Sequence, residues 1–111
     1  MDRLTELYNT IYPILKEYAD LPYADRNLEH KLVISDDHKD YLLMTIGWRD
    51  DVKIHGCVVH LEIIDQKVWI HRDGLEDGIA DDLVRAGIPP NQIVLAFHPP
   101  KIRHHTEFAV N

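Results

Sequence analysis

The fold is decided by residues 55–100, and the densest part of this stretch covers residues 69–80. That part is Trp69-Ile70-His71-Arg72-Asp73-Gly74-Leu75-Glu76-Asp77-Gly78-Ile79-Ala80. Its first residues predict the end of a strand, and Asp73-Gly74 predicts a turn out of the sheet. A helix is expected over 76–86, because Gly87 and the prolines that follow it are typical of a helix end. A short apolar run over 93–97 predicts a further strand or extended segment.

Upstream of this stretch, apolar runs separated by polar turns predict strands over 28–35, 41–49, 52–65 and 67–72. A helix is predicted over 2–20, with Asp2 as its N-cap and a kink near Pro13. Its apolar residues recur at three- and four-residue spacing: Leu4, Leu7, Tyr8, Ile11, Ile14, Leu15 and Tyr18. A connection over 23–27 and a tail anchored by residues 108–110 complete the predicted chain. We expect His104 and His105 to face solvent.

Tight turns at 50–51 and 65–66 predict the strand registers. They place Arg49 opposite Val52 and therefore Met44 opposite Cys57 and Leu42 opposite Val59. The second turn places Ile63 opposite Val68 and Leu61 opposite Ile70. Alternation then predicts one shared core face, made of Leu42, Met44, Ile46, Cys57, Val59, Leu61, Ile63, Val68 and Ile70.

The other sheet face also carries apolar residues, namely Tyr41, Leu43, Ile54 and Val58. Such a face is expected to be covered, either by the C-terminal segment or by a second subunit. We therefore expect a homodimer formed through this face or an edge. The predicted fold class is α+β in two layers. A mainly antiparallel sheet of four or more strands carries an N-terminal helix and a second helix after the fourth strand, all in one domain over 1–111.

Composition and charge limit the function. The chain has 111 residues, 12 basic and 19 acidic side chains and a formal net charge of −7. Proteins that bind nucleic acid directly carry a basic surface, so we expect no direct nucleic-acid binding. The N-terminus lacks a signal-peptide pattern, and no apolar run is long enough to span a membrane. We therefore expect a soluble, cytoplasmic protein. The single cysteine, Cys57, is expected to be a small buried apolar residue rather than a nucleophile.

The strand registers suggest one possible metal site. They place His60 opposite His71 and Glu62 opposite Trp69, and two imidazoles with a carboxylate can bind zinc. The sequence contains no HExxH motif and no Cys/His spacing typical of zinc sites. We therefore favour polar residues on a partly exposed or subunit-facing sheet surface, and expect no metal.

A second candidate is the acidic cluster of Asp73, Glu76, Asp77, Asp81 and Asp82. Carboxylates in this arrangement can act as acid and base or hold Mg²⁺. Acidic residues at a helix start are also favoured by the helix dipole. We favour the second explanation, and we expect no catalytic residue and no cofactor.

A series of short segments in a fixed order resembles a known family. The segments are 55–57, Asp65 ahead of Trp69-Ile70, 72–74, 78–80, 86–89 and Phe97-His98-Pro99-Pro100. Together with 17–19 and 106–110 they resemble the XisI family, the fdxN-element excision controlling factor proteins of cyanobacteria. His71 departs from the Gln common there, which weakens a metal site as a family property. Pro13, Leu75 and His105 depart as well.

The resemblance implies a non-enzymatic accessory factor that controls excision of a DNA element. Its implied partners are an XisH-like protein and an XisF-type site-specific recombinase, and it would act by protein–protein contact. Two alternatives stay open. One is a small metal-dependent enzyme or nuclease subunit that uses the acids near Asp73 or the pair His60 and His71. The other is an antitoxin-like neutraliser of an XisH-like partner.

Overall fold

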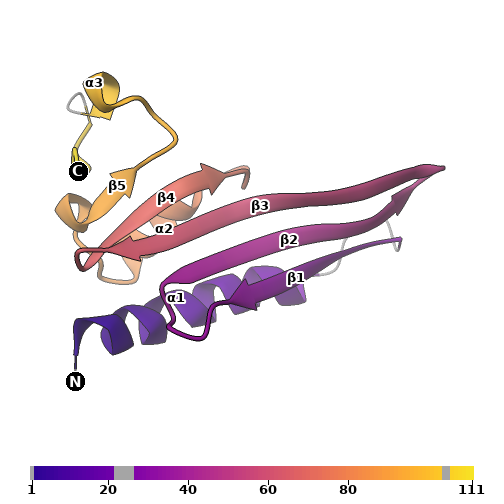
Figure 1. Ribbon diagram of the computed structural model, residues 1–111, viewed down its shortest axis with the longest axis horizontal. Helices are drawn as coiled ribbons and strands as arrows, with labels where there is room; N and C mark the ends of the chain where they lie inside the picture. Colours follow the sequence, from indigo (N-terminus) through magenta and orange to yellow (C-terminus); the bar gives the residue numbers. More distant parts are fainter. Residues whose placement is uncertain (1, 22–26, 104–105) are drawn as a thin grey trace.

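A computed structural model describes residues 2–21, 27–103 and 106–111. Most of the predicted connection over 23–27, together with His104 and His105, lies outside these residues. The elements are α1 (Arg3–Asp20), β1 (Leu28–Ile34), β2 (Asp40–Arg49), β3 (Val52–Ile64), β4 (Lys67–Asp73), α2 (Ile79–Arg85), η1 (Pro90–Gln92), β5 (Ile93–Leu95) and α3 (Pro100–Arg103). The strands form one five-stranded sheet in the order β1-β2-β3-β4-β5 (Figure 1). The first four strands pair antiparallel, and β5 is parallel to β4. The predicted α+β class is confirmed.

Helix α1 forms where its apolar spacing predicts it. The Asp2 carboxylate accepts a hydrogen bond from the Thr5 amide at 2.8 Å, which confirms the predicted N-cap. Leu7, Ile11 and Leu15 lie along one side of the helix and are fully buried. The helix contains Pro13 and continues to Asp20, while the kink near Pro13 stays a prediction.

The two predicted hairpin turns are confirmed. Asp65 and Gln66 both have positive φ, 52° and 67°, as a two-residue turn between twisted strands requires. The resulting registers place Arg49 opposite Val52, Ile63 opposite Val68 and Leu61 opposite Ile70, as predicted. The β2–β3 hairpin extends well beyond β4 and β5 (Figure 1).

Two β-bulges overturn part of the predicted face assignment. Met44 pairs with Cys57, as predicted, but Leu43 pairs with Val59, so that Val58 is an extra residue in β3. Leu42 therefore lies opposite His60 rather than opposite Val59. A shift of one residue moves side chains to the other face of a strand. For this reason, Leu42, Met44, Ile46 and Cys57 do not share a face with Val59, and their predicted place in the core is wrong.

The core lies between the sheet and the helices α1 and α2. Its sheet side includes Tyr41 and Leu43, both fully buried, which we had expected on the opposite face. These two side chains are not available to a second subunit. Val58 is only partly buried and packs against the same core. The homodimer stays a prediction, but most of the apolar residues on which it was based contribute to the core of the single chain. Among the described residues, the largest fully buried side chains include Tyr41, Leu7, Ile11, Leu15, Leu43, Leu61, Ile70, Ile79, Leu83, Ile93, Val59 and Val68.

The C-terminal segment covers part of the sheet face opposite the helices. The Arg103 guanidinium lies over the Trp69 ring at 5.6 Å from its centroid. It also donates to four backbone oxygens, including those of His98 at 3.0 Å and Val110 at 3.2 Å. Further along, the Ala109 amide donates to the Ile93 carbonyl at 2.8 Å. The prediction that the tail is anchored is confirmed, and its Arg103 covers Trp69 on this face. The apolar residues for which a cover was predicted include Tyr41 and Leu43, and these lie beneath the helices instead.

Helix α2 begins later than predicted, at Ile79 rather than at residue 76. Gly78 has φ 82°, which is not helical, and the Asp73 carboxylate accepts from the Ile79 amide at 2.8 Å. The capping side chain thus comes from the end of β4. The helix end agrees with prediction, because Gly87 has φ 107° and the Ile88 amide donates to the Leu83 carbonyl at 3.1 Å.

Candidate functional site

The predicted histidine cluster exists, but its register is different. His60 pairs with Arg72, and His71 is the extra residue of a second bulge, in β4. The two imidazole rings still approach to 4.9 Å between centroids. His71 Nε2 lies 2.8 Å from Glu62 Oε1, and His60 Nε2 lies 3.2 Å from Asp40 Oδ1. The sequence does not predict the contact of Asp40 with His60, because Asp40 is the first residue of β2 and approaches His60 only in the bulged register.

This cluster consists of two separate histidine–carboxylate pairs rather than a shared ligand set. Each imidazole directs its Nε2 to its own carboxylate, and all four side chains are about one-third exposed. Over residues 2–21, 27–103 and 106–111, no group of three or more His, Cys, Asp or Glu side chains is arranged to hold a metal ion. The pairs are accessible enough to form hydrogen bonds with a binding partner.

The acidic residues near Asp73 diverge. The Asp73 side chain is occupied by the α2 terminus, since it accepts from the amides of Ile79 at 2.8 Å and Leu75 at 3.3 Å. Glu76, Asp77 and Asp81 are exposed, whereas Asp82 faces α1. Paired-carboxylate chemistry needs side chains that converge on one point, and these do not.

Cys57 is half-buried rather than buried, because the bulge at Val58 places it on the face opposite the core. Burial raises the pKa of its thiol, and the nearby Arg72 opposes this shift only in part. A raised pKa keeps the thiol protonated at neutral pH, so it is a poor nucleophile.

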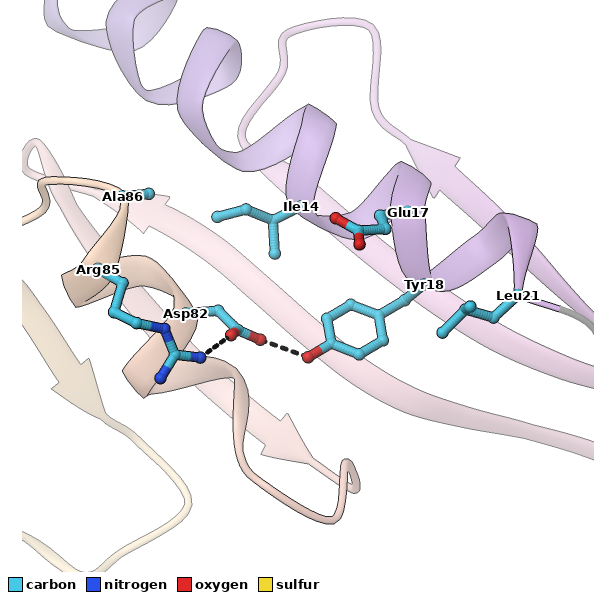
Figure 2. A pocket seen from close by; sticks show the side chains of 7 residues that line it. All are labelled: Ile14, Glu17, Tyr18, Leu21, Asp82, Arg85 and Ala86. Atoms are coloured by element: carbon cyan, nitrogen blue, oxygen red, sulfur yellow. Dashed lines mark hydrogen bonds and ion pairs between the residues drawn. The ribbon is translucent and has the colours of Figure 1, made fainter.

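One concave site in the described part of the chain is a groove between α1 and α2. Figure 2 shows its lining side chains, with α1 on one side and α2 on the other. The groove has a volume of about 350 Å³ and is open to solvent. Its lining residues are Ile14, Glu17, Tyr18 and Leu21 from α1 and its C-terminal end, and Asp82, Arg85 and Ala86 from α2 and its C-terminal end.

A hydrogen bond crosses the groove between the two helices. The Tyr18 hydroxyl donates to one oxygen of Asp82, and Arg85 pairs with the other oxygen of the same carboxylate (Figure 2). The bond to Asp82 and burial raise the pKa of Tyr18 to about 12. Tyr18 therefore remains a hydrogen-bond donor at neutral pH and does not act as a base. The sequence predicts Tyr18 on the apolar side of the first helix and Asp82 in an acidic cluster at a helix start, and it gives no sign of the contact between them.

The remaining groove residues suit binding rather than catalysis. Leu21 is 52% exposed, and Ile14 and Ala86 add apolar surface beside it. Glu17 is exposed on the α1 side. A concave surface with apolar side chains and a few directed polar groups is typical of binding sites.

Comparison with known proteins shows similarity to one family and to two solved structures. A model of the family described as XisI protein matches residues 1–110. A crystal structure of a XisI-like protein from Anabaena variabilis ATCC 29413 is 29% identical, with a TM-score of 0.89, covering 97% of this chain and 99% of the other. A crystal structure of the fdxN element excision controlling factor XisI from the same organism is 34% identical, with a TM-score of 0.83 and coverage of 99% and 100%.

No curated protein matches the chain. Among the described residues, no helix is long and apolar enough to cross a membrane. Because the family model covers all but the last residue, and two members of known structure share the fold over nearly their whole length, the chain belongs to the XisI family.

Proposed function

We propose that this protein is a non-enzymatic controlling factor in the excision of a DNA element, and that it acts through protein–protein contacts. The observation that carries the proposal is the family match over residues 1–110, together with the 34% identity to a protein described as the fdxN element excision controlling factor XisI. The partners would be an XisH-like protein, an XisF-type recombinase or both, and the protein would act in the cytoplasm.

Charge and geometry support a role without direct DNA contact. The net charge of −7 repels phosphates, since affinity for DNA depends on neutralising them with Lys and Arg. Asp73 caps a helix, Asp82 is bonded to Tyr18 and Arg85, and the other acids of this cluster are exposed. The histidines pair with separate carboxylates. These arrangements favour a partner-binding protein over the alternative of a small metal-dependent enzyme.

Co-purification with the proposed partners tests this function. The tagged chain is expressed with an XisH-like protein, an XisF-type recombinase or both, and excision of a reporter element is measured with and without the chain. We expect a stable complex with at least one partner and an excision frequency that depends on the chain. Retention of neither partner, or DNA cleavage by the isolated chain with Mg²⁺ or Mn²⁺, would refute the proposal. Rescue of cells from a toxic XisH-like protein, with no effect on excision, would favour the antitoxin-like alternative instead.

A further inference from the structure

The groove between α1 and α2 points to a specific kind of ligand. We propose that it docks a basic segment of the partner protein, in which a Lys or Arg side chain lies beside an apolar side chain. This inference rests on the proposed function, because it names the surface through which the chain would reach its partner. Three features of the groove favour this ligand, namely its apolar surface, the charge on its rim and the rigidity of its walls.

The apolar part of the groove is exposed. Leu21 closes α1 and leaves 52% of its surface in contact with solvent, and Ala86 lies across from α1 at the end of α2. Ile14 is half-buried and extends from α1 into the space between the helices (Figure 2). An apolar side chain of a partner that enters here removes the exposed surface of Leu21 and Ile14 from water, which stabilises the complex.

The charge of the groove selects a cation. The lining has two carboxylates, Glu17 and Asp82, and one cation, Arg85. Asp82 already accepts from Tyr18 and Arg85, so neither Asp82 nor Arg85 is available to a ligand without breaking a contact. Glu17 has no ion-pair partner among the described residues. The available charge of the groove is therefore the Glu17 carboxylate, which attracts a Lys or Arg.

The walls of the groove are held in place before any ligand binds. Leu15 of α1 and Leu83 of α2 are fully buried in the same core, and the bond between Tyr18 and Asp82 joins the helices at the groove itself. A preformed site loses little conformational freedom when it binds, so modest contacts suffice for a measurable affinity.

A basic segment is also the segment that a DNA-acting partner would offer. Proteins that act on DNA carry Lys and Arg where they meet phosphates. A groove with a free carboxylate, in a protein of net charge −7, has complementary charge and would steer such a segment toward it. Occupation of the groove would withdraw those basic side chains from DNA, which gives a controlling factor a direct means of control.

The primary test is an NMR titration of the full-length ¹⁵N-labelled chain with a synthetic peptide. The probe is an alanine-based helical peptide of about 16 residues with one Leu and one Arg four residues apart. Two matched peptides replace the Arg by Glu or the Leu by Ala. We expect the basic peptide to shift the amides of residues 14–21 and 82–86, and both matched peptides to bind more weakly. Shifts centred elsewhere, or equal binding of the basic and acidic peptides, overturn the proposal.

Matched variants separate the groove from the overall charge. Glu17→Lys should weaken peptide binding by about 10-fold, since it replaces an attraction by a repulsion. It should not unfold the protein, because α1 has no basic residue in its last turn and a cation there is favoured by the helix dipole. Glu29→Lys makes the same charge change on the exposed side of β1 and should change the affinity by less than about 2-fold. Leu21→Gln tests the apolar contact at an exposed position.

The same variants distinguish failure of the inference from failure of the proposed function. If the partner co-purifies equally well with the wild-type chain and Glu17→Lys, the groove is not the docking site, although the proposed function stands. If no partner co-purifies but the basic peptide still maps to the groove and responds to Glu17→Lys, the groove stands and the proposed function fails. Equal effects of Glu17→Lys and Glu29→Lys on peptide binding would show a general charge effect and would overturn the inference.

Discussion

The bulge at Val58 determines which of two neighbouring leucines is buried, and substitution of each leucine tests this assignment. Leu43 pairs with Val59 and is fully buried in the core, whereas Leu42 pairs with His60 on the opposite face and is partly exposed. Without the bulge their positions would be exchanged. Leu43→Ala and Leu42→Ala make the same chemical change at adjacent positions, so any difference in their effect reports which face each side chain occupies.

The expected magnitudes differ enough to be measured. Truncation of a fully buried leucine costs about 2–5 kcal/mol, because the lost transfer free energy adds to the cost of the cavity. We expect about 3 kcal/mol for Leu43→Ala, where Tyr41, Val59 and Leu61 belong to the same buried cluster. Leu42→Ala should cost about 1 kcal/mol, since part of its surface remains in water in the folded state. In thermal unfolding, the difference of about 2 kcal/mol corresponds to about 8 °C in Tm.

Urea denaturation followed by circular dichroism measures both free energies of unfolding. The m-value should be the same in the wild-type chain and the two variants, because each variant exposes the same chain on unfolding. Retention of the native peak pattern in NMR spectra of both variants controls for a rearranged fold. If Leu42→Ala destabilises the protein as much as Leu43→Ala or more, the register of β2 against β3 is wrong, and so is the assignment of the core face.

Three other substitutions test single contacts. Tyr18→Phe removes the bond to Asp82 and should lower the free energy of unfolding by about 1 kcal/mol at neutral pH, as measured in urea. Tyr41 has a buried hydroxyl without a hydrogen-bond partner among the described residues, so Tyr41→Phe should be neutral or stabilising by about 1 kcal/mol. Burial raises the pKa of Tyr41 to about 12, against 10.0 unperturbed. The unfolded chain therefore loses the Tyr41 proton at a lower pH than the folded chain. As a result, the wild-type chain should lose stability as the pH rises from 10 to 12. Tyr41→Phe lacks this proton and should lose less stability over the same pH range. Asp73→Ala should lower the free energy of unfolding by about 1 kcal/mol, because it removes the side chain that caps the Ile79 amide. Asp73→Asn should retain most of this stability, since Asn also caps helices. An equal loss in both variants would contradict the capping role.

Local signals in the sequence were sufficient to predict most of the elements. The helix α1, the turn at Asp65 and Gln66 and the helix end at Gly87 each depend on residues within a few positions of one another. The positions of these elements are determined by capping, turn geometry and apolar spacing, all of which are properties of short segments. The registers next to the turns followed for the same reason, because a two-residue turn fixes the first pairs of a hairpin.

The bulges could not be predicted because nothing in the residue type marks them. Val58 and His71 are ordinary strand residues, and the alternation of apolar side chains around Val58 is compatible with a regular strand. The choice between the regular and the bulged register depends on which side chains fit beneath α1 and α2. Burial of Tyr41 and Leu43 in that space requires the shift, and this is a property of the assembled core rather than of β3 alone.

The groove could not be predicted from short segments of the sequence either, because it also depends on how the helices pack together. Tyr18 and Asp82 are 64 residues apart, and nothing near either position indicates the other. They meet because Leu15 and Leu83, one turn or less away on their own helices, enter the same core and bring α1 beside α2. Once the helices are fixed, the contact between Tyr18, Asp82 and Arg85 neutralises the charges between them, and Glu17 and Leu21 are left facing outward at the same end. The helix spacing that builds the core thus also produces a surface with one free carboxylate beside exposed apolar atoms. In a protein of net charge −7, that surface combines a charge and an apolar contact, which is why we propose it as the docking site of a basic partner segment.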